Sequence, residues 1–342
     1  MNIKNVIFID LHSRDRQHLS GNISFIKNCI NYLQDISHDS NQSYYYYCHK
    51  SSYQYAKNWA KELKITNLKI TNKYNIDRDH VIIYLYPEYK DILLHLYLKL
   101  RGNHLIAVSH GHLNSFYNEK QKGILKIKRK LKTLFFSNFK NIICYSNHIK
   151  QNSSHHSPKI IHRKLSVISE IINTPLEKKS GYNFDNTNSN KIKIAFFRSP
   201  VNKLIKKTYE RILLLENIEL IDGSQYSIKS QKDYFKFIIN LDIIILDKIH
   251  DYQLQVSGIV NDCIAHGTIP IGTKLNRHLI YLNECGLLKN HWNLEDICMS
   301  DSKFPNAEDI KEFKLKCIKW INIAQRNNKS EFLRIIKNPL SL

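Results

Sequence analysis

Short apolar runs alternate with amphipathic segments along the first half of the chain. Between most of the runs, apolar residues recur at three- and four-residue spacing, which is typical of helices that cover a sheet. One such helix is expected through Ile23, Ile26, Ile30 and Leu33, after a polar loop at His12–Leu19. Strands that alternate with helices favour a doubly wound parallel sheet, so an α/β fold is predicted. The expected strands are Val6–Asp10, Ser43–Cys48, Leu68–Ile70, Val81–Tyr86, Leu105–Val108 and Ile142–Tyr145.

This alternation is interrupted once and then restarts. Asn173–Lys191 is rich in Asn and Ser, contains Pro and Gly, and has almost no apolar residues, which is typical of an interdomain linker. After it come a strand at Ile192–Phe197, a helical stretch through Leu215, the apolar segment Ile218–Ile221, a helix around Tyr234–Ile239, and helices without strands at Ala307–Ile323 and Glu331–Ile336. We therefore predict Rossmann-like domains at residues 1–172 and 192–306, a linker at 173–191, and C-terminal helices over 307–342.

The stretch Leu241–Gly272 is the most informative segment of the second domain. Its pattern predicts a buried strand at Leu241–Leu246, a polar loop, a helix at Ile259–Ala265 that Ser257 and Gly258 open, and a strand at Ile269–Gly272. This is a crossover unit of a parallel sheet, which places a helix N-terminus beside the ends of strands. Free N–H groups and the positive end of the helix dipole at Ser257 and Gly258 therefore predict a phosphate site.

A second basic feature follows the strand Ile192–Phe197. Arg198 stands at the end of this strand, and Lys203 comes five residues later. Arginine can bind a diphosphate with two parallel hydrogen bonds, so the pair predicts a site for a nucleotide diphosphate leaving group. Two solvated basic residues in a loop are the alternative interpretation.

Composition adds an electrostatic expectation. The 342 residues are 42% hydrophobic and carry a net charge of +21, which points to an anionic partner, although the many Lys, Asn and Ile can also reflect an AT-rich genome. Seven scattered cysteines without a C-x-x-C pair are typical of reduced thiols and argue against a disulfide framework or a zinc ribbon. No run approaches the roughly 20 apolar residues of a membrane span, and no secretory signal precedes the first strand. A cytoplasmic protein is expected.

The two basic motifs resemble the donor half of the large GT-B family of retaining, nucleotide-sugar-dependent glycosyltransferases. In that family a strand ends in Gly-Arg, Lys-Gly lies five residues after the Arg, and a later helix carries Glu-Ala ahead of a Gly-x-Pro turn. This chain reads Phe197-Arg198 with Lys203-Leu204, and Asp262-Cys263 ahead of Gly267-Thr268-Ile269-Pro270. Both glycines of the first motif are replaced, the proline falls one residue late, and Leu254 stands where the family often has a second glutamate.

This resemblance implies a fold of two Rossmann-like domains that face a central cleft. It implies that Arg198 and Lys203 bind the donor diphosphate together with Ser257 and Gly258, and that Asp262, at the position of the family glutamate, binds the ribose. No metal or cofactor is required if these groups stabilise the departing diphosphate, because the nucleotide sugar is itself a substrate. With these departures, the motifs resemble those of a divergent branch of enzymes of polysaccharide, O-antigen and lipopolysaccharide assembly.

The N-terminal half contributes acceptor-side candidates. Ser20 and Gly21, ahead of the first helix, fit loosely the glycine-containing loop that the family has after its first strand. His110 and His112 follow the strand Leu105–Val108, where similar enzymes place a histidine that faces the transferred sugar. The two histidines either take this catalytic role or are an incidental pair, since no third ligand is spaced to join them at a metal.

Gly123–Lys140 is the strongest electrostatic feature of the sequence. Apolar residues recur at helical spacing, and five basic residues occupy much of the remaining surface: Lys126, Lys128, Arg129, Lys130 and Lys132. Such a helix is suited to lie on an anionic bilayer, although a helix packed on the sheet with a solvated basic face gives the same pattern.

The sequence thus predicts an enzyme, a glycosyltransferase that moves a sugar from a nucleotide diphosphate donor to a saccharide acceptor, expected to be lipid-linked, in bacterial surface polysaccharide biosynthesis. The expected partners are a nucleotide sugar, the acceptor and an anionic membrane surface, and the expected location is the cytoplasm, at the inner face of the cell membrane. A catalytically degenerate GT-B partner protein is one alternative. A basic nucleic-acid-binding protein is another, but no helix-turn-helix, zinc-finger or RNP-like pattern supports nucleic acid as a partner.

Overall fold

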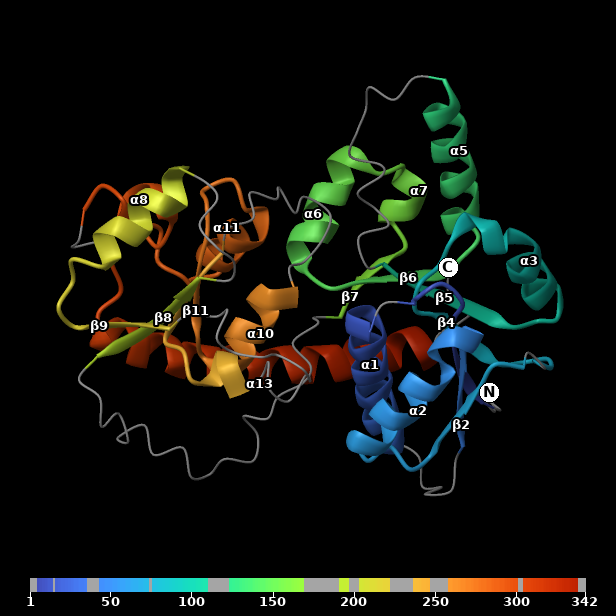
Figure 1. Cartoon of the computed structure of the whole chain (residues 1–342). Helices are drawn as coiled ribbons and strands as arrows, with labels where there is room; N and C mark the ends of the chain where they lie inside the picture. Colours follow the sequence, from blue (N-terminus) through green and yellow to red (C-terminus); the bar gives the residue numbers. More distant parts are fainter. Residues whose placement is uncertain are drawn as a thin grey trace. The chain divides into compact units, whose positions relative to one another are not determined.

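The computed structural model describes residues 5–14, 16–35, 43–73, 76–109, 123–168, 191–196, 203–221, 236–246, 258–300 and 304–337. The chain divides into two compact units (Figure 1). Unit 1 comprises Met1–Ile172 and Gln325–Leu342, and unit 2 comprises Asn173–Ala324.

Unit 1 is built on a seven-stranded parallel sheet within the described residues. The strand order is β3-β2-β1-β4-β5-β6-β7, and every neighbouring pair is parallel. Six of these strands were expected from sequence, and their bounds agree with the expected ones to within two residues at either end. The three-residue β7 was not expected. The strands are β1 (Val6–Asp10), β2 (Tyr44–Cys48), β3 (Leu68–Thr71), β4 (Val81–Tyr84), β5 (His104–Val108), β6 (Asn141–Cys144) and β7 (Leu165–Val167).

Helices cover both faces of this sheet. The chain runs from β1 toward one edge and from β4 toward the other, and right-handed crossovers then place the two sets of helices on opposite faces. α1 and α2 pack against each other, and α5 and α6 both contact α7. The helices are α1 (Arg16–Gln34), α2 (Tyr53–Glu62), α3 (Ile92–Leu100), α5 (Ile124–Ser137), α6 (Asn147–His156) and α7 (Lys159–His162), with 3₁₀ turns η1 (Lys50–Ser52) and η2 (Tyr89–Asp91).

The start of α1 differs from the expectation. The sequence predicts a loop up to Leu19 with Ser20 and Gly21 ahead of the helix, but α1 begins at Arg16. Leu19 is 1% exposed and lies four residues before Ile23, so it extends the buried stripe of the helix by one turn. Ser20 and Gly21 therefore lie inside α1 and not in a loop.

Unit 2 is built on a four-stranded parallel sheet of order β11-β10-β8-β9 within the described residues. The expected crossover unit is confirmed, because α10 begins at Gly258 and joins the buried strands β10 and β11. Gly267 ends α10 at φ +71°, a left-handed conformation that glycine adopts at little cost. The elements are β8 (Ile192–Phe196), α8 (Lys203–Ile212), β9 (Ile218–Ile221), β10 (Ile243–Ile245), α10 (Gly258–His266), β11 (Ile269–Ile271), α11 (Arg277–Glu284) and α12 (Leu294–Ile297).

One long helix, α13 (Ala307–Lys337), belongs to both units. In unit 2, Nζ of Lys314 lies 3.0 Å from Oδ1 of Asp242. In unit 1, Nζ of Lys329 lies 2.8 Å from Oδ2 of Asp35. The sequence predicts two helices here because residues 324–330 are largely polar, but they contain no Gly or Pro, so nothing ends the first helix.

Candidate functional site

Each sheet contains one point at which the strand order reverses. In unit 1 this point lies between β1 and β4, and in unit 2 it lies between β8 and β10. In open parallel sheets, ligands bind at the carboxyl ends of the strands that flank such a reversal. The loops that follow these four strands are therefore the candidate positions for binding and chemistry.

A buried carboxylate organises the loop after β1. Asp10 ends the strand and is 1% exposed. Its Oδ1 accepts hydrogen bonds from the backbone N–H of Ser13 at 2.9 Å and of His12 at 3.3 Å. Its Oδ2 accepts from Nδ2 of Asn22 at 2.6 Å and from the Tyr46 hydroxyl at 3.3 Å. These bonds fix the backbone that carries His12.

His12 and Asp91 form a dyad across the reversal in unit 1. His12 follows β1, Asp91 ends η2 after β4, and Nε2 of His12 lies 2.7 Å from Oδ2 of Asp91. Because a carboxylate only accepts, Nε2 carries the proton and Nδ1 is the nitrogen that can take one. The hydrogen bond to Asp91 raises the pKa of His12 above its usual value of 6.5. The imidazole is 23% exposed and the carboxylate 10%, so a substrate can reach the base while its partner stays largely covered.

The surroundings of the dyad carry further charge. Glu88 and Asp10 also raise the pKa of His12, after the larger effect of Asp91. Lys132 on α5 lies within electrostatic range of Glu88, and burial lowers the pKa of this lysine. Since α5 also contacts η2, the basic helix borders the acceptor-side candidate site.

The donor-side candidates lie around the reversal in unit 2. Lys203 is the first residue of α8, and Gly258 is the exposed first residue of α10, with open space where a side chain would begin. Asp262 lies one turn into α10 and is half-buried. Arg198 and Ser257 lie outside the described residues, in the segments that follow β8 and β10. The two helix starts therefore stand on the loops that topology assigns to ligand binding.

The other predicted site residues are placed only in part. His110 and His112 lie outside the described residues, after β5. Ser20 and Gly21 lie in α1, as described above. The five basic residues all lie on α5: Lys126, Lys128 and Lys130 are exposed, and Arg129 and Lys132 are half-buried.

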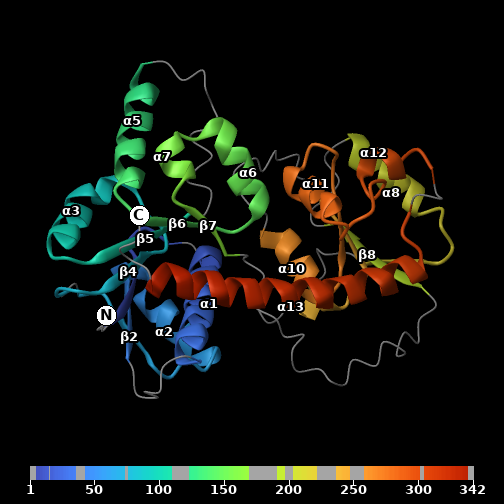
Figure 2. The same ribbon diagram turned by 180° about the vertical axis from the view of Figure 1, so that it is seen from behind.

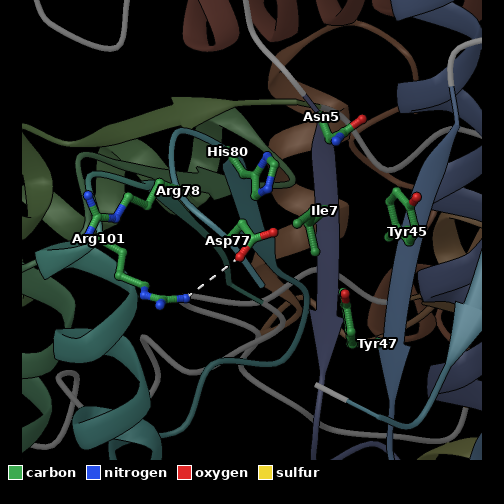
Figure 3. A pocket seen from close by; sticks show the side chains of 8 residues that line it. All are labelled: Asn5, Ile7, Tyr45, Tyr47, Asp77, Arg78, His80 and Arg101. Carbon is green, nitrogen blue, oxygen red and sulfur yellow. Dashed lines mark ion pairs between the residues drawn. The ribbon is translucent and has the colours of Figure 1, made fainter. Parts of the chain in front are cut away.

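A pocket of about 590 Å³ lies at the opposite edge of the unit 1 sheet (Figure 3). Asn5 precedes β1 and His80 precedes β4, so the pocket borders the amino ends of these strands. Oδ1 of Asp77 lies 4.0 Å from Nη1 of Arg101, so the carboxylate of Asp77 offsets part of the positive charge of Arg101. Its place at the amino ends separates this pocket from the His12–Asp91 dyad. The lining residues are Asn5, Ile7, Tyr45, Tyr47, Asp77, Arg78, His80 and Arg101.

Two features are absent from the described part of the chain. It contains no group of three or more His, Cys, Asp and Glu side chains placed to hold a metal ion. Among the same residues, no helix has both the length and the apolar character needed to cross a bilayer.

The two parallel sheets and the helical C-terminal region define a GT-B fold, as the comparison with solved structures shows. UGT89C1 from Arabidopsis thaliana in complex with UDP matches with a TM-score of 0.54 and 8% identity, over 98% of this chain and 99% of that chain. MnaA from S. aureus in complex with UDP matches at 0.51 and 10%, over 98% and 95%. A UDP-N-acetylglucosamine 2-epimerase matches at 0.52 and 12%, over 100% and 98%. No protein-family model and no curated protein matches the sequence.

Sequence reasoning missed both members of the dyad. The pattern predicts a polar loop at His12 and no element at Asp91, and it gives no reason to pair two residues that lie 79 positions apart. One signal was present, since both residues follow apolar runs that are predicted to be strands of one parallel sheet. The carboxyl ends of parallel strands lie at the same edge of a sheet, so polar residues after such strands can meet.

Proposed function

We propose that the protein is a nucleotide-sugar-dependent glycosyltransferase, which moves a sugar from a nucleotide diphosphate donor to a hydroxyl group of a saccharide acceptor. The observation that carries the proposal is the His12–Asp91 dyad at the carboxyl edge of the unit 1 sheet. The fold is consistent with it, because two of the proteins that share this fold were solved with UDP bound.

On the acceptor side, His12 acts as the general base. Nδ1 takes the proton from the acceptor hydroxyl while the hydroxyl oxygen bonds to the anomeric carbon of the donor sugar. The bond from that carbon to the diphosphate oxygen breaks, and the diphosphate leaves with the electron pair. Asp91 holds the imidazole in the required tautomer and stabilises the imidazolium that forms. A single displacement of this kind inverts the anomeric configuration, because the hydroxyl attacks from the side opposite the leaving group. The proposed outcome therefore differs from the retention that is typical of the family whose donor motifs this chain resembles.

On the donor side, positive charge stabilises the departing diphosphate. Arg198 and Lys203 bind its oxygens, the N–H groups at Ser257 and Gly258 add backbone donors, and Asp262 binds the ribose hydroxyls. These groups supply the positive charge, so the proposal includes no metal. His110 and His112 are assigned to the transferred sugar, as the family resemblance implies.

The proposed setting is the assembly of a bacterial surface polysaccharide, such as O-antigen or lipopolysaccharide, on a lipid-linked acceptor. This part of the proposal rests on the resemblance of the donor motifs to enzymes of that branch. Epimerisation of a nucleotide sugar without an acceptor is the second candidate function, because one of the structural neighbours is a UDP-N-acetylglucosamine 2-epimerase.

The first test separates donor binding from chemistry. Thermal shift with a panel of nucleoside diphosphates and nucleotide sugars identifies the donor, since a ligand at about 100 times its Kd contributes roughly 2.7 kcal/mol of stability. Arg198→Ala and Asp262→Ala should lose the shift, whereas His12→Ala should keep it.

The second test uses the donor identified in this way. Wild type should release nucleotide diphosphate faster when acceptor saccharides are added, and His12→Ala should lose this stimulation. NMR of the product should show inverted configuration at the anomeric carbon. Formation of a new nucleotide sugar without acceptor would show that the protein is an epimerase and not a transferase. Full turnover by His12→Ala would show that His12 is not the general base.

A further inference from the structure

Half of the large apolar side chains that are exposed in the described residues lie on α3 and α5. Both helices belong to unit 1. Exposed apolar residues are normally scattered singly, so a cluster of them on two helices marks a surface for interaction. The exposed fractions are 78% for Leu93, 40% for Leu96 and 89% for Leu100 on α3, and 60% for Ile127, 42% for Leu131 and 53% for Leu134 on α5.

On each helix these residues form a stripe. Leu93, Leu96 and Leu100 are spaced by three and four residues, which places them on one side of α3. His95 and Leu98 on the same helix are 0% and 1% exposed, so another side packs inward. The stripe therefore remains outside after the helix has packed on its sheet.

The same division holds for α5. Ile127, Leu131 and Leu134 are spaced by four and three residues and stay exposed, whereas Phe135 and Phe136 are buried. The sequence pattern allows either a helix that lies on a bilayer or a helix packed on the sheet. In the structure the C-terminal phenylalanines pack inward, whereas Ile127, Leu131 and Leu134 stay exposed.

The two helices lie together in unit 1. Nζ of Lys99, at the end of α3, donates to Oδ1 of Asn138, just after α5, at 3.1 Å. The ring of His95 lies 4.4 Å from that of Phe139 and 5.3 Å from that of Phe135. Figures 1 and 2 both show α5 beside α3, with the first turns of α5 extending away from the sheet.

Charge selects the kind of surface that these stripes fit. Neither helix contains an acidic residue. Lys99, Lys126, Lys128 and Lys130 are exposed around the apolar side chains. A protein partner that buried the leucines would also have to compensate these lysines in a low dielectric, and a nucleic acid would use the lysines but leave the leucines in water. An anionic bilayer satisfies both, since apolar side chains enter the acyl boundary while lysines reach the headgroup phosphates.

We propose that α3 and α5 form a docking surface for an anionic lipid bilayer. The exposed leucines and Ile127 insert at the boundary between headgroups and acyl chains, and the lysines bind lipid phosphates. This proposal goes beyond glycosyl transfer and does not depend on it. Because α5 contacts η2, which carries Asp91, a docked bilayer would lie beside the acceptor-side dyad, within reach of an acceptor whose lipid stays in the membrane.

The test is co-sedimentation of the full chain with vesicles. Wild type should bind vesicles of phosphatidylglycerol and phosphatidylcholine, should bind vesicles of phosphatidylcholine alone much more weakly, and should be released by salt. Replacing Lys126, Lys128 and Lys130 by Gln should lower partitioning on the order of 100-fold, since each basic residue near an anionic surface contributes about fivefold. Leu93→Ser with Leu100→Ser should weaken binding although the charge is unchanged.

Matched substitutions in unit 2 provide the control. Leu213 and Leu214 are 56% and 81% exposed, so Leu213→Ser with Leu214→Ser removes similar apolar surface elsewhere and should leave vesicle binding unchanged. All variants should keep the circular dichroism, melting temperature and nucleotide binding of wild type. Equal binding to neutral and anionic vesicles, or equal loss in the control variant, would overturn the proposal. A dimer in solution that Leu93→Ser with Leu100→Ser dissociates would assign the surface to a second copy instead.

Discussion

His95 makes a sharp prediction about acid stability. Its side chain is 0% exposed and packs against the rings of Tyr84, Phe135 and Phe139. Within the described residues neither ring nitrogen has a hydrogen-bond partner. Burial among these groups lowers the pKa of His95 from 6.5 to about 4, with a smaller effect of Lys99. The folded protein therefore holds this histidine neutral at pH values where the unfolded chain protonates it.

The sign and size follow from proton linkage. The unfolded chain binds a proton near pH 6.5 and the folded chain only near pH 4, so stability is full above 6.5 and falls progressively as the pH drops toward 4. Between pH 7.5 and pH 5, these two values correspond to a loss of about 2 kcal/mol from His95. His95→Leu has a similar volume and no titrating group. It should retain wild-type stability near pH 7.5 and lose about 2 kcal/mol less than wild type at pH 5.

Urea denaturation at a series of pH values, followed by circular dichroism, measures this difference. The control is His155→Leu, which removes a histidine that is exposed on α6, so an effect shared by both variants would not be due to the burial of His95. His104, whose pKa burial also lowers to about 4, remains in both variants, so part of the acid sensitivity should persist. If His95→Leu loses as much free energy of unfolding as wild type between these pH values, His95 is not held neutral and the packing argument fails.

Three further outcomes follow from the structure. Asp91→Asn should lower turnover on the order of 100-fold and move the acidic limb of the pH–rate profile to lower pH, because it removes the carboxylate that raises the pKa of His12; an unmoved limb would contradict the pairing. Asp10→Ala should destabilise unit 1 by about 1–3 kcal/mol in urea titration, because it leaves buried donors without their acceptor, and wild-type stability would show that the loop is held otherwise. Gly267→Ala should destabilise unit 2 more than Gly286→Ala in the same assay. Both glycines have positive φ, but only at Gly267 would an added Cβ lie 2.9 Å from Cγ of Lys314. Equal effects would mean that the Lys314 side chain moves freely.

Local pattern determined much of the fold. Val6–Asp10 and Ile218–Ile221 have the bounds expected from their apolar runs, and α10 begins at the predicted glycine. Parallel strands buried on both faces read as continuous apolar runs, which makes them easy to recognise. Leu165–Val167 was missed because a three-residue strand carries too short a pattern. The long α13 was divided in two because a polar stretch lowers the periodic signal without breaking a helix.

The candidate site could be predicted only in part. The helix start at Gly258 is confirmed, because a glycine that opens a helix after a strand is visible in a short window of sequence, whereas the ligand roles of Gly258 and Lys203 stay predictions. The dyad of His12 and Asp91 was not, because their contact depends on the order of strands in the sheet. Local periodicity predicts that strands exist but not which strands are neighbours, and the reversal between β1 and β4 brings these side chains together.

The sharing of α13 has a consequence for the order in which the protein can fold. Phe332, Ile335 and Ile336 are 0–1% exposed and belong to unit 1, and the ring of Phe332 lies 6.0 Å from that of Tyr32 on α1. The ribosome makes these residues only after the whole of unit 2. The core of unit 1 therefore stays incomplete throughout most of synthesis, and a chain released before residue 325 would expose apolar surface on α1 to chaperones and proteases.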